Sequence, residues 1–437
     1  MNIGARPASS KKKGTARQRW LILTQYYPPE IGAPQIRLRC LVRELLRHGK
    51  EVSVLTAMPN YPAGKIFDQY KGRIYFQEQV DGVKVRRTWV YAATGRAAWA
   101  RFLNYCSFAA TALVVVLFGP RPDVIFLEAQ PLPLGMVGLI MKYLRGVPYI
   151  YNVPDLQVDV AREFGFLRKQ FLLRLAEKAE SLFLRQAWRV STVTHRFIEH
   201  FKSRGIPAGR VTFLPNGADT EFLAPSEPDE EYRKEWGLKG KTVVAYVGTH
   251  AYYHGLDTLV RAAELLSDDA RIALVMVGNG PERERIRNLA AQKGLTNIIF
   301  ATVPYEGMSR LYSVVHVAVA TLRNVPVAKG MRLSKVFPAL SCGVPVIYSG
   351  EGEAAELLAV HKCGLTAPPE DPAALADAIR ELVRNVALRE QLGRNGRRLV
   401  ESEYSWSTIV DRWLSEIDRQ RSAPSAFCEA TTTEPVR

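Results

Sequence analysis

The sequence predicts an α/β protein built from two Rossmann-like domains, each a doubly wound parallel sheet, that face each other across a cleft. Three observations support this prediction. Short apolar runs alternate with longer amphipathic segments along most of the chain, which is typical of strand–helix–strand units. The alternation is interrupted by turn residues at 214–217 and restarts after residue 219. The length of 437 residues is sufficient for two domains, each with its own core.

The first half contains five apolar runs with the length of buried strands. The helix expected after the first run ends at Gly49, because glycine commonly follows the last turn of a helix. We expect strands at 20–24, 51–56, 123–127, 147–152 and 189–194, and helices at 35–48, 134–144 and about 167–186.

The second half repeats this alternation after an acidic, proline-containing stretch that extends to about residue 235. The pattern divides the chain into a disordered basic tail at 1–18, domains at 19–218 and 219–403, and a disordered tail at 422–437. Within the second domain we expect strands at 241–247, 271–277, 298–300, 315–321 and 344–348, and helices at 256–266, 281–293 and 334–341.

Positive charge is concentrated in the first half of the chain. Residues 1–200 hold 30 Lys and Arg against 14 Asp and Glu, whereas the remaining residues hold 29 of each. Such a field favours an anionic partner, although a basic surface can also serve solubility alone. No recognition motif for nucleic acid is present, so we expect no nucleic-acid partner. The five cysteines are far apart and include no C-x-x-C pair, which argues against a zinc site and fits a reducing compartment.

One segment is apolar enough to be weighed as a membrane span. Residues 102–119 carry no charge, and their number is the lower limit for a spanning helix. Arg101 and Arg121 flank the segment, and three polar residues interrupt it. The surrounding α/β pattern favours a core helix, or a helix that contacts a membrane, over a span.

A basic loop in the second half combines the features of an anion site. Lys329, Arg332 and Lys335 lie close to the start of the helix expected at 334–341. Cations and free backbone amides at a helix start together stabilise phosphate groups. The loop is also expected at the carboxyl edge of the sheet, where open α/β sheets bind ligands. We therefore expect it to hold a diphosphate, with a solvated loop as the alternative.

Two glycine-rich turns follow neighbouring strands of the same domain. Gly248-Thr249-His250 follows the strand at 241–247, and Gly278-Asn279-Gly280-Pro281 follows the strand at 271–277. The second turn has a proline suited to the first helical turn, so backbone amides are placed at a helix start. Neither turn is specific alone, but both belong to the same predicted edge as the basic loop.

The first domain offers two candidate positions at its own cleft edge. The loop at 26–34, with Gly32, Ala33 and Pro34, opens the first helix and is either an anion site or a rigid turn. Asp155 follows the strand at 147–152. Its carboxylate is either a candidate for acid–base chemistry at the cleft or a cap of the next helix.

The order of these motifs resembles that of retaining GT-B glycosyltransferases of the family 4 type, in the branch that builds bacterial capsule, O-antigen and exopolysaccharide. The resemblance covers about residues 20–420 and includes the 26–34 loop, the glycine turns and the 334–347 stretch. It ends at Tyr404-Ser405-Trp406. In such enzymes these residues open a helix that crosses back to the first domain, expected here at 404–421.

The resemblance also implies roles for single residues. Gly248, Thr249 and His254 would join the basic loop around the donor diphosphate. The first domain would hold the acceptor, with Gly32, Ala33 and Pro34 in its acceptor loop and with Asp155 orienting or deprotonating the acceptor hydroxyl. Many relatives carry two glutamates separated by seven residues, but Gly330 and Pro338 occupy those positions here. The nearest acidic candidates for the ribose and donor sugar are Glu353 and Glu356, which could equally be ordinary helix-start carboxylates.

The implied activity is transfer of a sugar from a UDP- or GDP-type nucleotide sugar to a lipid-linked or oligosaccharide acceptor. We expect a polyprenyl-diphosphate-linked acceptor, an anionic membrane surface as partner, and a cytoplasmic location at the inner face of the plasma membrane. No metal cofactor is expected, because the sequence has no Asp-x-Asp motif. A GT-B nucleotide-sugar 2-epimerase and a non-catalytic sugar-nucleotide-binding protein are the alternatives.

Overall fold

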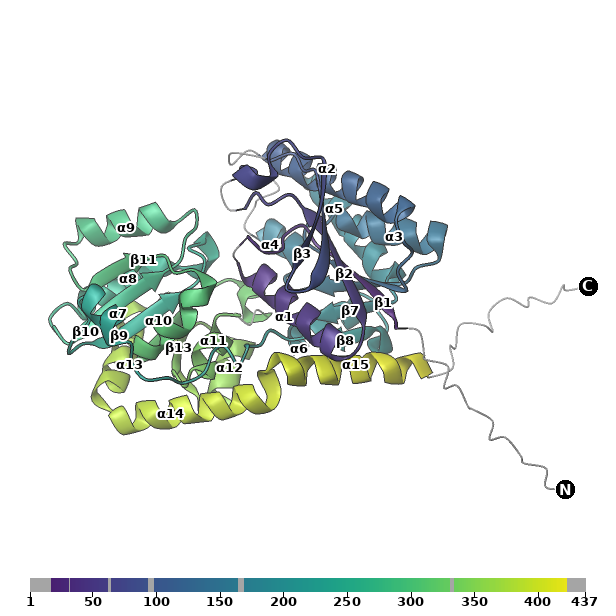
Figure 1. The fold of residues 1–437 in the computed structure, drawn as a ribbon. Helices are drawn as coiled ribbons and strands as arrows, with labels where there is room; N and C mark the ends of the chain where they lie inside the picture. Colours follow the sequence, from purple (N-terminus) through teal and green to yellow (C-terminus); the bar gives the residue numbers. More distant parts are fainter. Residues whose placement is uncertain are drawn as a thin grey trace, which may run out of the picture.

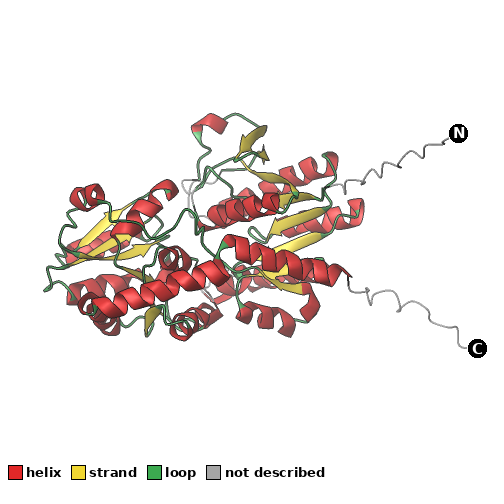
Figure 2. Cartoon of the chain, turned by 60° about the horizontal axis from the view of Figure 1, so that its bottom comes forward, coloured by secondary structure: helices red, strands yellow, loops and turns green. Residues whose placement is uncertain are grey.

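The computed structural model describes residues 17–30, 32–61, 64–92, 98–163, 169–330 and 334–422. They form two α/β domains, which lie side by side in Figure 1. In each domain a twisted sheet lies between layers of helices, as the view from below shows (Figure 2).

The first domain contains an eight-stranded sheet in the order β3-β4-β2-β1-β5-β6-β7-β8, parallel except for the β3–β4 pair. Its strands are β1 (Arg19–Leu23), β2 (Glu51–Ala57), β3 (Tyr75–Val80), β4 (Val83–Thr88), β5 (Val124–Glu128), β6 (Tyr149–Val153), β7 (Arg189–Thr192) and β8 (Val211–Phe213). Its helices are α1 (Ala33–Arg47), α2 (Ala98–Phe118), α3 (Leu134–Arg145), α4 (Gln157–Glu163), α5 (Gln170–Gln186) and α6 (His195–Ser203).

Apolar side chains on the two faces of this sheet build separate cores. One core packs α2, α3, α5 and α6 against the sheet, with Phe108, Met141, Phe183 and Phe201 fully buried or nearly so. The other core packs α1 and the C-terminal helix α15 (Trp406–Ser422) against the opposite face. The central strands β1, β5 and β6 are buried along nearly their whole length, which explains their continuous apolar runs.

The β3–β4 hairpin is an addition to the predicted fold. Its side chains alternate between exposed and partly buried positions along β3, and its turn is Asp81-Gly82. Both turn residues have positive φ, 51° and 76°, as the favoured two-residue hairpin turn requires. The hairpin gives the otherwise parallel sheet an antiparallel edge.

The second domain contains a six-stranded parallel sheet in the order β11-β10-β9-β12-β13-β14. Its strands are β9 (Thr242–Val247), β10 (Ile272–Val277), β11 (Ile298–Ala301), β12 (Val317–Thr321), β13 (Val346–Ser349) and β14 (Gly364–Ala367). Its helices are α7 (Glu230–Glu235), α8 (Leu256–Leu265), α9 (Arg283–Gln292), α10 (Met308–Val314), α11 (Val336–Ser341), α12 (Glu353–Val360), α13 (Pro372–Arg384) and α14 (Val386–Leu399). Both sheet faces again carry a separate core.

The chain crosses between the domains at two adjacent points. The Ala218 amide donates to the Tyr404 carbonyl at 3.0 Å, and the Trp406 amide donates to the Ala218 carbonyl at 3.3 Å. A side chain at Gly217 would begin 2.3 Å from the Tyr404 carbonyl oxygen, so only glycine permits this approach.

Helix α15 follows the second crossing and lies along the first domain (Figure 1). Trp413 is fully buried there, and its Nε1 lies 3.0 Å from Ser191 Oγ. Its ring contacts Trp20 edge-on, with centroids 5.9 Å apart. The predicted fold, including the helix that returns to the first domain, is confirmed.

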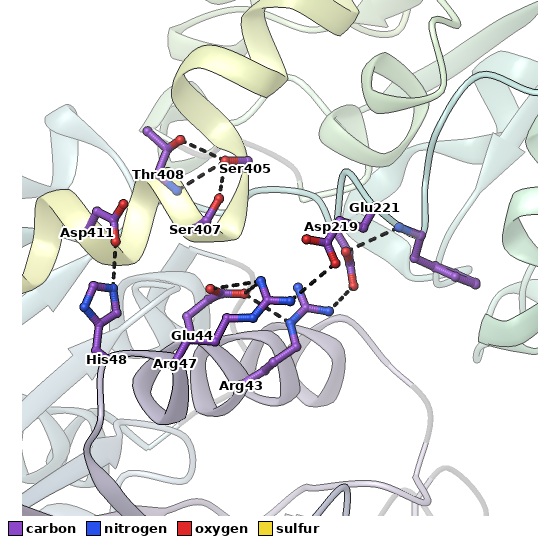
Figure 3. A network of polar contacts seen from close by, with 11 residues as sticks. Arg43, Glu44, Arg47, His48, Asp219, Glu221, Ser405, Ser407, Thr408 and Asp411 are labelled. Carbon is purple, nitrogen blue, oxygen red and sulfur yellow. Dashed lines mark hydrogen bonds and ion pairs between the residues drawn. The ribbon is translucent and has the colours of Figure 1, made fainter.

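Ion pairs from α1 reach the crossing region (Figure 3). Arg43 Nη1 lies 2.5 Å from Asp219 Oδ2, directly after the first crossing. His48 Nε2 lies 2.6 Å from Asp411 Oδ1 of α15. The first helix of the chain is therefore fastened to both segments that join the domains.

Candidate active site in the cleft

The glycine turns of the second domain touch each other at the carboxyl edge of its sheet. The His250 amide donates to the Asn279 carbonyl at 2.8 Å, which ties the loop after β9 to the loop after β10. A side chain at Gly278 would begin 2.0 Å from the Gly248 carbonyl oxygen, and φ of Gly278 is +136°. Glycine is therefore required here on two grounds: close approach and backbone conformation. The structure brings the two turns together, in line with their predicted common edge.

Lys335 lies directly behind these turns. It occupies the residue before α11, and its Nζ donates to the Tyr246 hydroxyl at 2.7 Å. The same Nζ lies 3.2 Å and 3.4 Å from the two ring nitrogens of His254. A side chain at Gly248 would begin 3.1 Å from Lys335 Nζ. Lys335, His254 and Gly248, three of the residues predicted for the donor diphosphate, are thus in one cluster, which we call the Lys335 cluster.

The electrostatic environment of Lys335 is unusual for a lysine. No carboxylate among the described residues forms an ion pair with Lys335, and burial lowers its pKa well below the usual lysine value. Burial lowers the pKa of His254 as well, and the nearby Lys335 lowers it further. His250 is fully buried, and burial is the main cause that lowers its pKa to about 4. An anion would stabilise the charged lysine, which gives the cluster an intrinsic preference for a negative ligand.

The remaining predicted diphosphate residues are described only in part. Thr249 belongs to the cluster through its backbone, because the Tyr246 hydroxyl donates to the Thr249 carbonyl at 2.7 Å. Lys329 lies in a short helical turn at Pro326–Gly330, although its side chain is not described. Arg332 lies outside the described residues. The position of Gly330 is informative, because a side chain there would begin 3.0 Å from the Phe197 ring of the first domain. The basic loop therefore extends to the domain interface.

Glu353 and Glu356 make contacts that the sequence did not suggest. Glu353 is nearly buried, and its two carboxylate oxygens each accept a backbone amide of α6, from His195 and Arg196, both at 3.2 Å. Glu356 Oε1 accepts from Arg196 Nη2 at 2.7 Å. A carboxylate at a helix start accepts hydrogen bonds from the free amides and interacts favourably with the positive end of the helix dipole. Here the helix is α6 of the first domain, so both glutamates join the domains.

Asp155 lies at the cleft edge of the first domain, two residues after β6. Its side chain is exposed to solvent, yet surrounding protein raises the pKa of its carboxyl, while Arg37 and Gln130 oppose the rise. Gln130 Nε2 donates to Asp155 Oδ2 at 3.3 Å. Among the described residues no amide of the following helix is bonded to this carboxylate, so the capping alternative lacks its defining contact.

A buried polar network underlies Asp155. Arg37 Nη2 donates to both carboxylate oxygens of Glu128 at 2.8 Å, and Asn152 Nδ2 donates to Glu128 Oε1 at 2.8 Å. Glu128 ends β5 and Asn152 lies near the end of β6, so the network sits at the same sheet edge. This network was not predicted from the sequence. The available signal was a glutamate inside an otherwise apolar strand, since buried carboxylates are rare unless paired.

The predicted acceptor loop packs around a second buried carboxylate. Glu30 accepts the amides of Asn60 and Tyr61 at 2.8 Å and that of Tyr27 at 3.3 Å. Burial raises the pKa of Glu30 to about 7 in spite of these bonds. Gly32 precedes α1 and Pro34 lies in its first turn, with no side-chain cap, whereas the Ala33 side chain is not described. The start of α1 therefore has no side-chain cap among the described residues, and the choice between an anion site and a rigid turn stays a prediction.

Tyrosines connect the two sides of the cleft. Tyr253, next to His254, is partly buried, and burial, Asp155 and Tyr61 all raise its pKa. Tyr61 in turn lies against Tyr26, with ring centroids 5.6 Å apart. Asp155 of the first domain thus lies within electrostatic range of the residue beside the Lys335 cluster. A basic site for an anion and a carboxylate therefore lie on facing edges of the two sheets.

Comparison with known proteins assigns this arrangement to a class of enzyme. Residues 32–217 match the family of glycosyl transferase 4-like domains, and residues 228–399 match the family described as glycosyl transferases group 1. Together these matches cover most of the chain. The protein is therefore a glycosyltransferase of the GT-B fold, with a 4-like domain followed by a group 1 domain.

Named relatives belong to the same class. The chain is 26% identical over 282 residues to the colanic acid biosynthesis glycosyl transferase WcaI of Escherichia coli, covering 63% of this chain and 69% of the relative. It is 29% identical over 310 residues to a GDP-mannose-dependent alpha-mannosyltransferase of Mycobacterium tuberculosis, covering 70% and 75%. Both relatives are named as enzymes that transfer sugars, one of them in colanic acid biosynthesis.

Solved structures share the fold at low sequence identity. Sucrose-phosphate synthase from Thermosynechococcus elongatus superposes with a TM-score of 0.73 at 22% identity, covering 93% of this chain and 99% of that one. HepE of Anabaena, in complex with UDP-glucose, has a TM-score of 0.68 at 16% identity, covering 92% and 100%. At these identities the likeness establishes the two-domain architecture alone.

Proposed function

We propose that the protein is a retaining glycosyltransferase of bacterial surface polysaccharide biosynthesis, with a UDP- or GDP-sugar as donor and a lipid-linked or oligosaccharide acceptor. The observation that carries the proposal is the Lys335 cluster, which faces Asp155 across the cleft. The names of the relatives support the setting, since they include a colanic acid enzyme and a GDP-mannose-dependent enzyme. The complex of HepE with UDP-glucose supports a nucleotide-sugar donor.

In this proposal the second domain binds the donor. Breaking the glycosyl–phosphate bond develops negative charge on the leaving diphosphate, and preorganised cations and amides stabilise that charge most. Lys335 supplies the cation, and the residues that follow Gly248 and Gly278 supply backbone amides next to it. Thr249, His254, Lys329 and Arg332 complete the predicted set. No metal is needed for the diphosphate in this scheme.

The first domain binds the acceptor and supplies Asp155. Its carboxylate orients or deprotonates the acceptor hydroxyl, provided that it is ionised. The proposal includes retention without a covalent carboxylate intermediate. A polyprenyl-diphosphate-linked acceptor fits the basic first half, and such an acceptor implies a cytoplasmic enzyme at the inner face of the plasma membrane.

A screen for donor binding followed by one substitution tests the proposal. Thermal unfolding is measured with UDP-, GDP-, ADP- and TDP-sugars, because a ligand that binds only the folded state raises the midpoint. Hydrolysis and transfer are then measured with the donor that stabilises the protein. We expect Lys335→Ala to lower turnover by roughly 10²-fold, the scale of losing one preorganised group. Unchanged turnover in this variant would remove Lys335 from the site.

The same assays separate the alternatives. An epimerase would convert the donor alone into a new nucleotide sugar, and a non-catalytic binding protein would be stabilised without turnover. None of the relatives reported above carries an epimerase name. Absence of stabilisation by every nucleotide sugar would contradict the proposed function as a whole.

A further inference from the structure

Helices α2, α3 and α5 carry large apolar side chains on the outside of the first domain. They form one layer on the sheet, with α3 in contact with both of its neighbours (Figure 1). Each of the six residues that define this surface is more than half exposed, from 54% for Leu175 to 87% for Phe118. We call it the three-helix surface and define it by Trp99, Phe102, Phe118, Leu144, Phe171 and Leu175. Large exposed apolar side chains gathered on one layer of helices are a mark of interaction sites.

Helix α2 is long enough to cross a membrane but is fixed in the domain. Its segment Trp99–Phe118 has a mean hydropathy of 1.6, with only 28% of its most apolar window buried. The inner side of the helix belongs to the core, where Phe108 and Ala112 are fully buried. Asn104 Oδ1 accepts from Gln25 Nε2 at 2.6 Å. Removal of α2 would expose this core and break this bond. The helix can therefore lie on a partner surface, but it cannot leave the fold to cross a membrane.

The charges of α5 indicate what that partner is. On its exposed side Arg174, Lys178 and Arg185 alternate with Phe171, Leu175 and Leu182. Its two acids are turned away and paired, Glu180 with Arg204 at 2.6 Å and Glu177 with Arg162. The outer side of α5 is therefore both apolar and purely cationic. A helix with this pattern binds the interface of an anionic lipid bilayer.

This charge pattern also decides between a membrane and a second copy of the chain. In a symmetric dimer the same patch lies on both sides of the interface. The cationic side of α5 would then face like charges, with no exposed acid on that helix to pair with them. Anionic headgroups pair with every one of these cations. The lipid surface is therefore the occupant that the residues favour.

The surface begins beside the cleft. Gln25, which binds Asn104 of α2, directly precedes Tyr26 of the predicted acceptor loop. Tyr105 and Arg101, both in the first two turns of α2, influence the pKa of Tyr26. A substrate carried in the bilayer would therefore reach the cleft along α2.

We infer that the three-helix surface docks the protein on an anionic membrane, with α2 and α5 lying in the headgroup region. The inference goes beyond the proposed reaction, since docking does not depend on turnover. It also predicts which residues set the two components of binding. The apolar side chains of α2 set the insertion, and the cations of α5 set the preference for anionic lipid.

Co-sedimentation of the full chain with vesicles tests the inference. Vesicles of phosphatidylcholine are compared with vesicles of phosphatidylcholine and phosphatidylglycerol, at low and at high salt. We expect sedimentation with the anionic vesicles that decreases as salt rises. Arg174→Gln with Lys178→Gln should lower the partition coefficient about 30-fold, since each cation contributes roughly a factor of five. Phe102→Ser with Phe118→Ser should lower it at least about 10-fold.

Matched control variants lie on the second domain. Lys239→Gln with Arg394→Gln removes two exposed cations, and Tyr252→Ser with Val360→Ser removes two exposed apolar side chains. These controls should sediment like the unaltered protein. All altered residues are exposed, so thermal unfolding is expected to stay unchanged and to show that each variant is folded.

The outcomes separate this inference from the proposed function. Failure to sediment with anionic vesicles overturns the inference. It is also overturned if the α2 and α5 variants sediment to the same extent as the unaltered protein. Dimerisation that the Phe102→Ser, Phe118→Ser variant abolishes, without vesicle binding, also overturns it, because a second copy then covers the surface. Sedimentation by a protein that binds no nucleotide sugar sustains the docking surface and contradicts only the proposed reaction.

Discussion

The two domains share a fold but present different surfaces to the cleft. In the second domain, glycines at the turns let two backbone loops touch, and Lys335 is already bonded to Tyr246 and close to His254. In the first, Asp155 is open to solvent and its carboxylate accepts one weak hydrogen bond, from Gln130. The first half is strongly basic and the second is neutral.

In the proposed function, this difference would allow one architecture to serve two ligands. A site whose backbone loops touch each other has little freedom to change shape, which suits a group common to all donors, such as a diphosphate. An open carboxylate beside tyrosines and free amides leaves room for varied acceptors. The proposed assignment of the donor to the second domain and the acceptor to the first can therefore be tested by substitutions that act on one side of the cleft only.

The largest expected effect is at Asp155. Asp155→Asn should lower turnover by roughly 10³-fold, the middle of the range for a general base, without changing donor binding. Because the surrounding protein raises the pKa of this solvent-exposed carboxyl, its ionised form is lost as pH falls through a value above that of a free aspartate. The decrease of turnover at acid pH should therefore be absent in the variant. Kinetics and donor titrations over pH measure both effects, and a parallel loss of donor binding would contradict the proposed assignment.

A smaller effect is expected in the stability of the first domain. The pKa of Glu30 is about 7 in the fold and about 4.5 in an unfolded chain, so between these values the folded state holds a proton that the unfolded state releases. Stability therefore falls as pH rises through this window, and Glu30 contributes at least about 2 kcal/mol to the fall. Denaturant unfolding of Glu30→Gln should show a shallower decline. A variant with the same slope as the unaltered protein would show that Glu30 is not the titrating group.

The smallest expected effect concerns the contact between the domains. Glu353→Gln removes a charge from the start of α6 and should lower the free energy of unfolding by about 1 kcal/mol, with donor affinity unchanged. The matched control is Glu356→Gln, whose exposed ion pair should contribute at most about 0.5 kcal/mol. The donor-sugar role expected from the sequence predicts the reverse pattern: weaker donor binding at unchanged stability. Calorimetric titration and unfolding of both variants distinguish the two roles.

The fold was predictable because its signals are local. Buried parallel strands read as short apolar runs, and the restart after residue 219 marks the second domain. The β3–β4 hairpin was missed because its strands alternate weakly and carry several charges, although Asp81-Gly82 is a strong hairpin signal. The short strand β8 lacks a distinct pattern of its own.

The site was predictable only where residues share a sheet edge. Lys335, Gly248 and Gly278 follow strands or open a helix, so their meeting follows from topology. The contacts of Glu353 with α6 could not be read from sequence, because they depend on how two domains are placed. The same holds for Glu128 and Arg37, which lie 91 residues apart and meet only through the sheet order.

The adjacent crossings at Ala218 and Ser405 limit how the cleft can change. Two chain segments that are hydrogen-bonded at one place resist sliding and twisting, whereas a single linker would allow both. Rotation of the domains about that place is the motion that these bonds restrict least. The ion pair of Arg43 with Asp219 holds α1 to the same place. A spectroscopic ruler between Asp155 and Tyr253 would follow such a rotation across the cleft.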